Sequence, residues 1–134
     1  MLNSKAFVGY IVAGDPDLET SLDLMHLSVD SGIDILEIGV PFTDPIAEGP
    51  TIQQAHDRSL ENDTNLQKII ELVGRFREKD NETPIILMGY INNFLTYKGI
   101  FIVSINFVFI EFLFVVLHVS VDVKPMVFVI KEVI

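Results

Sequence analysis

The chain has 134 residues, a formal net charge of −10 and no cysteine. This length suffices for one domain with a sizeable core. The acidic balance argues against nucleic-acid binding, because neutralising phosphates requires clustered Lys and Arg. Without cysteine the protein has no disulfide, no thiolate nucleophile and no cysteine-ligated zinc. The first residues resemble no secretory signal, so we expect a cytoplasmic protein.

Residues 1–98 have the pattern of alternating strands and helices. In chain order we expect a strand at 6–13, a helix that begins after Asp15-Pro16-Asp17 and ends at Ser31-Gly32, a strand at 33–40, helices at 51–60 and 64–80, and a strand at 84–88. In the helix at 51–60 we expect Ile52, Ala55 and Leu60 to point into the core. Short connections between such elements predict a parallel sheet with right-handed crossovers.

An acid lies near the end of the second expected strand. Glu37 follows an apolar run, and a loop rich in Gly and Pro comes next and carries Asp44 and Glu48. A carboxylate where a buried strand meets a loop is suited to proton transfer, because burial raises its pKa toward neutrality. From the residues alone, an ordinary ion pair is the commoner role for an acid such as Glu37, and a solvated loop acid remains an equal alternative for Glu48.

Four segments in order resemble the tryptophan synthase alpha subunit family, a family of (β/α)8 barrels. They are Phe7–Asp17, Leu36–Pro45, Gly49–Gln53 and Leu87–Asn92. The resemblance covers residues 6–98 and implies an α/β fold, a partial TIM barrel of about three βα units. The chain has about half of the roughly 250 residues that a complete barrel needs, so we expect a truncated and impaired enzyme.

The resemblance implies a carbon–carbon lyase of tryptophan biosynthesis. Its reaction is the retro-aldol cleavage of indole-3-glycerol phosphate to indole and glyceraldehyde 3-phosphate. Glu37 and Glu48 would be the catalytic carboxylates, with Glu48 standing where the family usually has Asp. Tyr10 and Met88 would be walls of the indole pocket. The Gly-rich loops that bind the substrate phosphate in the family have no counterpart in this sequence.

The resemblance also implies a partner, the tryptophan synthase beta subunit, in an assembly of two alpha and two beta subunits. Pro41, Asp44 and Asn92 would contact that partner. No cofactor is expected in this chain, since pyridoxal phosphate belongs to the beta subunit. His26 and His56 lie on expected helices without a second ligand three or four residues away, so we expect no metal site and no functional role for them.

Residues 99–134 form a hydrophobic tail of a different kind. Between Ile100 and Val119, sixteen of twenty residues are Ile, Val, Leu or Phe. The tail could be a transmembrane helix, a pair of buried strands or the product of a shifted reading frame. A membrane contact is possible only through this tail. The alternative to a lyase is therefore a non-catalytic, membrane-anchored or interaction protein whose residues 1–98 form a soluble acidic head.

Overall fold

The structure is a computed structural model that describes residues 5–46, 48–90, 93, 114–118 and 126–131. Its elements in chain order are β1 (Val8–Val12), α1 (Leu18–Asp30), β2 (Ile35–Gly39), α2 (Pro50–Glu61), α3 (Leu66–Arg77), β3 (Ile85–Tyr90), β4 (Phe114–His118) and β5 (Met126–Lys131). The alternation of strands and helices expected for residues 1–98 is confirmed. Element ends differ from the expected ones by at most three residues.

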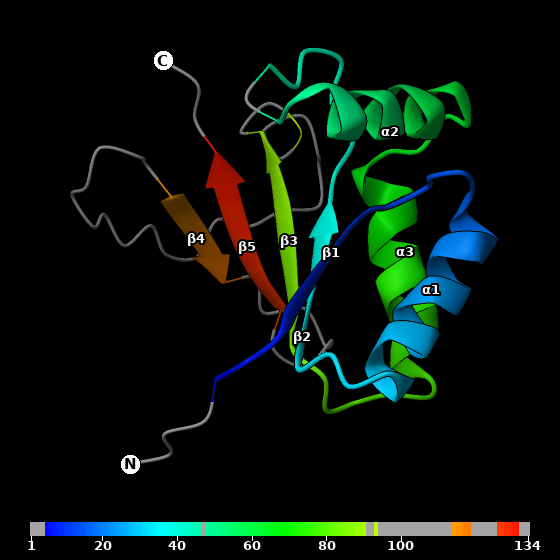
Figure 1. Ribbon diagram of the computed structural model, residues 1–134, viewed down its shortest axis with the longest axis vertical. Helices are drawn as coiled ribbons and strands as arrows, with labels where there is room; N and C mark the ends of the chain where they lie inside the picture. The colour runs from blue at the N-terminus through cyan, green and yellow to red at the C-terminus, as the bar shows by residue number, and fades with distance from the viewer. Residues whose placement is uncertain (1–4, 47, 91–92, 94–113, 119–125, 132–134) are drawn as a thin grey trace.

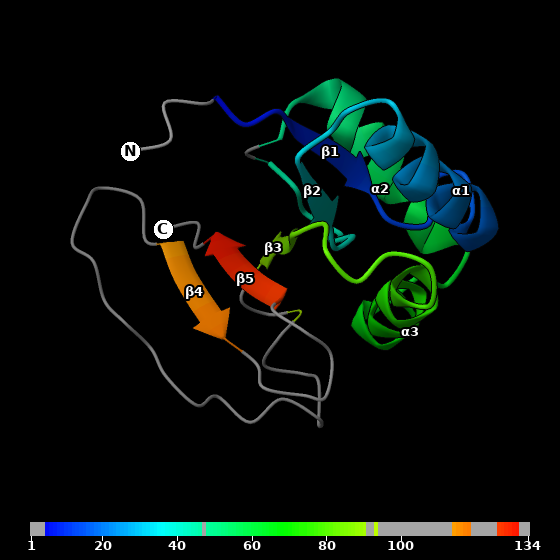
Figure 2. The same ribbon diagram turned by 90° about the horizontal axis from the view of Figure 1, so that it is seen from below.

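The strands form one sheet in the order β1-β2-β3-β5-β4 (Figure 1). β1, β2, β3 and β5 run parallel, and β4 pairs antiparallel with β5. Viewed along the strands, α1 and α3 lie against one face of this sheet (Figure 2). Parallel strands joined through helices on one face are the building units of a TIM barrel, so the partial barrel expected from the sequence is confirmed.

The hydrophobic core lies between this face of the sheet and the two helices. Leu36 and Ile38 of β2 are at most 1% exposed, and they pack with Met25 of α1 and with Ile69 and Phe76 of α3. Leu36 and Ile38 are alternate residues of one strand, so the intervening side chains of β2 point to the opposite face. This alternation places Glu37 on the face that carries neither α1 nor α3.

The buried face of α2 agrees with the expected one at Ala55 but not at Ile52 and Leu60. Its buried residues are Ala55, His56 and Ser59, whereas Ile52 and Leu60 are only partly covered. The physical reason is the position of α2, which lies beside the loops at the carboxyl ends of the strands (Figure 1). Loops present backbone N–H and C=O groups that need hydrogen-bond partners, so polar side chains are buried there.

The hydrophobic tail contributes the strands β4 and β5. The rest of residues 99–134 lies outside the described residues, so the three alternatives for it stay predictions. Within the part of the chain that the structure describes, we find no helix of the length and apolarity needed to cross a bilayer.

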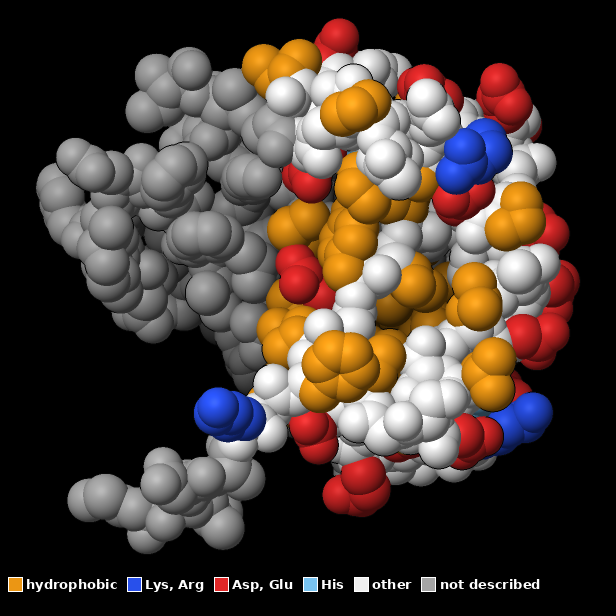
Figure 3. Space-filling model, in the orientation of Figure 1, with side chains coloured by type: hydrophobic (Ala, Val, Ile, Leu, Met, Phe, Trp, Pro, Cys, Tyr) orange, Lys and Arg blue, Asp and Glu red, His pale blue; other side chains and the backbone are white. Residues whose placement is uncertain are grey.

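β1 lies at one edge of the sheet and pairs with β2. Two apolar side chains at its start are exposed, Phe7 by 63% and Val8 by 44%. The space-filling view shows hydrophobic side chains along the middle of this side of the molecule, with acidic side chains around them (Figure 3). In a closed barrel a further strand pairs with this edge, so the described sheet is open at β1, as it is at its other edge strand, β4.

Candidate active site

Three of the residues that the sequence analysis selected share the face of the sheet opposite α1 and α3. Tyr10 of β1 and Glu37 of β2 are direct neighbours in the parallel register. Met88 of β3 pairs with Gly39 of β2, and it points to this same face because the preceding Leu87 is buried in the core. The fold therefore brings Tyr10, Glu37 and Met88 together on adjacent strands.

The Tyr10 ring leans toward the carboxyl end of β2. A Cβ atom on Gly39 would lie 2.3 Å from the Tyr10 hydroxyl oxygen, so the ring occupies the space above this glycine. The hydroxyl is buried and has no hydrogen-bond partner among the described residues. Burial raises the pKa of Tyr10, and the charges of Glu48 and Glu37 raise it further. The phenol consequently stays protonated, and both predicted carboxylates lie near it.

Glu48 comes from the loop between β2 and α2, which folds back on itself. The backbone N–H of Glu48 donates to the Pro45 carbonyl at 3.1 Å, and the Gln53 side-chain amide donates to the same carbonyl at 3.2 Å. The next residue, Gly49, has a φ of 80° and is the N-cap of α2. This turn requires glycine, since other residues rarely adopt such a φ. Glu48 is thereby placed at the start of α2, above the strand ends.

The first residues of the same loop are tied to β3 and to α2. The Phe42 ring stacks on the Tyr90 ring with 4.5 Å between the ring centroids. The backbone N–H of Phe42 donates to Nδ1 of His56 at 3.0 Å. Asn93 joins Pro41 to Tyr90, because its Nδ2 donates to the Pro41 carbonyl at 2.9 Å and its Oδ1 accepts the Tyr90 N–H at 3.2 Å. The loop that carries Glu48 is therefore anchored on both sides.

His56 is a residue of this site that the sequence analysis set aside. Its side chain is buried, and its Nε2 has no hydrogen-bond partner among the described residues. Burial lowers the pKa of His56, whereas the charges of Glu48 and Asp57 oppose that shift. One signal could have identified it: His56 and Ser59 are three residues apart and share a helix face, which makes that face polar.

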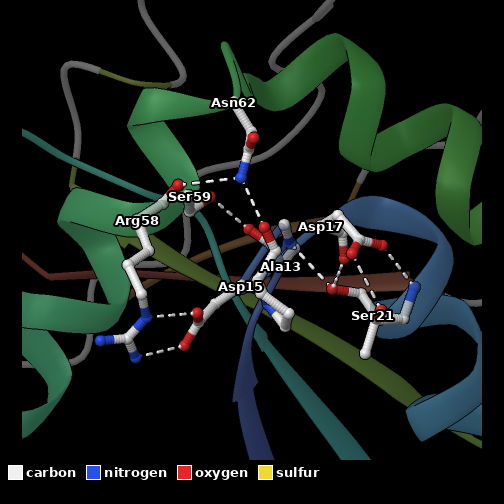
Figure 4. Close-up of polar contacts among 10 residues, drawn as sticks. Ala13, Asp15, Asp17, Ser21, Arg58, Ser59 and Asn62 are labelled. Carbon is white, nitrogen blue, oxygen red and sulfur yellow. Dashed lines mark hydrogen bonds and ion pairs between the residues drawn. The ribbon is translucent and has the colours of Figure 1, made fainter.

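The turn after β1 is held by two side chains of α2 and by that of its C-cap residue, Asn62 (Figure 4). Arg58 forms a two-point ion pair with Asp15, the Ser59 hydroxyl donates to the Ala13 carbonyl, and the Asn62 amide donates to the Pro16 carbonyl. From the other side, Oγ of Ser21 in α1 accepts the Gly14 N–H at 2.9 Å. These contacts fix the end of β1, and with it Tyr10, relative to α2.

The residues expected to contact a partner differ in exposure. Pro41 is buried, whereas Asp44 is exposed and its Oδ2 accepts the Thr43 hydroxyl at 3.1 Å. Nearby Ile46 is 70% exposed. Asn92 lies outside the described residues, so its role stays a prediction. No cluster of three or more His, Cys, Asp or Glu side chains suited to a metal ion occurs among the described residues.

Comparisons with known proteins identify a family. The chain matches the family model for the tryptophan synthase alpha chain over residues 1–122. It is 54% identical to the tryptophan synthase alpha chain of Neisseria gonorrhoeae over 88 residues, which are 66% of this chain and 34% of that one. The corresponding protein of Alkalilimnicola ehrlichii is 53% identical over 88 residues, 66% of this chain and 32% of that one. The chain thus spans about a third of the length of the curated relatives it matches.

Solved structures agree with this match. The tryptophan synthase subunit alpha of Legionella pneumophila superposes with a TM-score of 0.69 and 47% identity, over 71% of this chain and 36% of that one. A chain of the tryptophan synthase complex of Pyrococcus furiosus superposes with a TM-score of 0.60 and 40% identity, over 67% of this chain and 40% of that one.

Proposed function

Because the chain belongs to the tryptophan synthase alpha chain family, we propose that it carries the acid–base residues for cleavage of indole-3-glycerol phosphate to indole and glyceraldehyde 3-phosphate. The observation that supports this most directly is the register of the sheet, which pairs Tyr10 with Glu37 on the face opposite the core. The charges of Glu48 and Glu37 both raise the pKa of Tyr10, in agreement with this arrangement. Two carboxylates from different elements, beside one aromatic wall, are an arrangement suited to acid–base chemistry.

The retro-aldol reaction requires two proton transfers. A proton is added to C3 of the indole ring, and a proton leaves the hydroxyl group whose carbon becomes the aldehyde as the carbon–carbon bond breaks. Glu37 is proposed as the group that handles these protons, because it lies on a strand next to Tyr10 and on the face opposite the core. General acid–base catalysis of this kind contributes about 10²- to 10⁴-fold to a rate.

Glu48 is proposed to accept a hydrogen bond from the indole N–H. It comes from a loop above the strand ends, so it approaches the same space from another direction than Glu37. The aromatic ring of Tyr10 and the thioether of Met88 would then contact the indole ring as apolar walls of the pocket. The protonated Tyr10 hydroxyl adds a hydrogen-bond donor to this wall.

Several parts of the proposed function rest on the family alone. They are the beta subunit as partner, its contacts with Pro41, Asp44 and Asn92, the absence of a cofactor in this chain, and a cytoplasmic location. In TIM barrels phosphate groups are frequently bound by the loops after strands seven and eight. The residues described here would therefore supply the acid–base part of the reaction rather than the phosphate site.

The test is indole release from indole-3-glycerol phosphate, measured with and without a tryptophan synthase beta subunit. We expect release by the unmutated chain and a loss of about 10²- to 10⁴-fold in Glu37→Gln, which keeps the side-chain shape but cannot exchange a proton. Glu61→Gln, the same change at an exposed position near the end of α2, is the matched control and should retain the rate. The proposal fails if the unmutated chain releases no indole under either condition.

A further inference from the structure

The His56 imidazole connects the loop after β2 with α2. Its side chain is 2% exposed, and its Nδ1 accepts the Phe42 N–H at 3.0 Å. An imidazole nitrogen that accepts a hydrogen bond carries no proton, so in the neutral ring the proton is on Nε2. That Nε2–H is buried and has no hydrogen-bond partner among the described residues. A buried donor without an acceptor is unfavourable, so the Nε2–H of His56 is available to an acceptor side chain of the site.

Resting on the function proposed above, we propose that His56 is a positioning residue for Glu48. Its Nδ1 fixes the loop through the Phe42 N–H, and its Nε2–H is the hydrogen-bond donor that orients the Glu48 carboxylate toward the indole N–H.

The charges around His56 favour Glu48 as the acceptor. Of the two acids that oppose the effect of burial on the pKa of His56, Glu48 has the larger influence and Asp57 the smaller. Asp57 is exposed and directly follows His56 in α2, and adjacent residues of a helix do not face each other. Glu48 instead lies at the start of α2, on the loop that His56 already holds.

The neighbouring contacts keep the donor fixed. The Phe42 ring is stacked on Tyr90, and Asn93 ties Pro41 to the same strand end. The loop therefore cannot shift away from His56 without breaking contacts with β3. A donor held in this way restricts the rotamers of the flexible Glu48 side chain, and such preorganisation lowers the entropy cost of binding.

The first experiment needs no substrate. In the full chain with ¹⁵N-labelled histidine, NMR should identify His56 as the neutral tautomer protonated at Nε2, with its signals assigned by their loss in His56→Gln. Glu48→Gln should shift the Nε2 resonance and lower the pKa of His56 further. Asp57→Asn removes the same charge from the adjacent residue and should have the smaller effect. An equal or larger effect of Asp57→Asn, or protonation at Nδ1, would overturn the proposal.

The second experiment uses two variants, each of which keeps one of the two hydrogen-bonding groups of the imidazole, the acceptor at Nδ1 or the donor at Nε2. His56→Asn places an amide oxygen near the position of Nδ1 but has no donor at the position of Nε2. His56→Gln reaches the position of Nε2 with an amide donor. We expect His56→Gln to stay close to the unmutated kcat/KM and His56→Asn to lose roughly 10- to 100-fold, the effect of one lost hydrogen bond to a charged group.

The opposite order, with activity retained in His56→Asn and lost in His56→Gln, would mean that His56 only anchors the loop, and it would overturn the proposal. Thermal unfolding of both variants separates this effect from a general loss of stability. If the unmutated chain releases no indole, the proposed function fails, whereas the NMR comparison of Glu48→Gln with Asp57→Asn still decides whether His56 and Glu48 are coupled.

Discussion

The hydroxyl oxygen of Tyr10 lies 2.3 Å from the place where a Cβ atom on Gly39 would be, so a glycine at the end of β2 makes room for a tyrosine of β1. Gly39 itself lies in the strand and has no positive φ, so its backbone conformation does not require glycine. The absence of a side chain there is therefore a matter of space. The phenol ring of Tyr10 occupies the space that Gly39 leaves open, close to Glu37 and Glu48.

Gly39→Ala should displace the Tyr10 ring. We expect a destabilisation of about 1–3 kcal/mol, typical of an overpacked site, together with slower indole release. In the Tyr10→Phe background the nearest remaining atom is the ring carbon Cζ at 2.9 Å, so part of the cost should disappear. Denaturant unfolding of the two single variants and the double variant measures this coupling. Strictly additive effects would contradict the contact.

The stability of the chain should depend on Tyr10 at alkaline pH. Burial, with the charges of Glu48 and Glu37, raises the pKa of Tyr10 in the folded chain above the value of about 10 expected when it is unfolded. The folded state then holds this proton more tightly. The contribution of the protonated Tyr10 to the free energy of unfolding is therefore fully present below about pH 10. It is lost as the pH rises through the raised pKa of Tyr10 in the folded chain.

Tyr10→Phe should remove this alkaline dependence, which unfolding curves between neutral pH and about pH 11 would reveal. Glu48→Gln should weaken the alkaline pH dependence of stability without removing it, because it removes one of the charges that raise the pKa of Tyr10. Titration of phenolate absorbance, compared between the unmutated chain and Tyr10→Phe, checks the assignment. Identical alkaline unfolding in the unmutated chain and Tyr10→Phe would refute it.

Gly14 in the turn after β1 should tolerate no side chain. Its φ is +85°, and a Cβ atom there would lie 2.2 Å from Oγ1 of Thr64 and 2.7 Å from Oγ of Ser59. We expect Gly14→Ala to destabilise the chain by about 2–4 kcal/mol, from backbone strain and steric overlap together. Gly74 in α3 is the matched control, since a Cβ atom there meets nothing within 4 Å. Gly74→Ala should stabilise by about 0.5–1 kcal/mol in the same unfolding assay.

The ion pair between Arg58 and Asp15 should matter more than the one between Arg75 and Glu19. Both are two-point pairs, but the Asp15 side chain is 19% exposed and the Glu19 side chain 73% exposed. Exposed ion pairs contribute little and are screened by salt. We therefore expect Arg58→Gln to lower the melting temperature more than Arg75→Gln at low salt. The difference should narrow in molar salt; an equal effect of the two changes would contradict this interpretation.

The site can be traced back to the sequence only in part. Glu37 could be placed opposite the core, because it shares the parity of Ile35 and alternates with the buried Leu36 and Ile38. Glu48 was selected because of its motif, since nothing in the periodicity of a loop indicates where a side chain points. His56 was set aside because a lone histidine on a helix has many structural explanations and no second ligand accompanied it.

The inner face of α2 illustrates why the remainder could not be predicted. We expected Ile52, Ala55 and Leu60 of this helix to point into the core, and of these three only Ala55 is buried. The structure places α2 beside the loops that follow β1 and β2, where His56 and Ser59 supply partners for backbone groups. A helix that covers loop ends buries polar side chains, and its own sequence does not say which surface it covers.

By itself the sequence determined the order of strands and helices, the apolar stripes of α1 and α3 and the family, because these depend on local periodicity and on motifs contiguous in the chain. Only the tertiary structure placed Tyr10 beside Glu37 and brought the charge of Glu48 close to both Tyr10 and His56. The physical reason is that these residues come from β1, β2, a loop and α2. Their proximity depends on strand register and on how one loop is anchored, and neither is encoded in the spacing of residues along the chain.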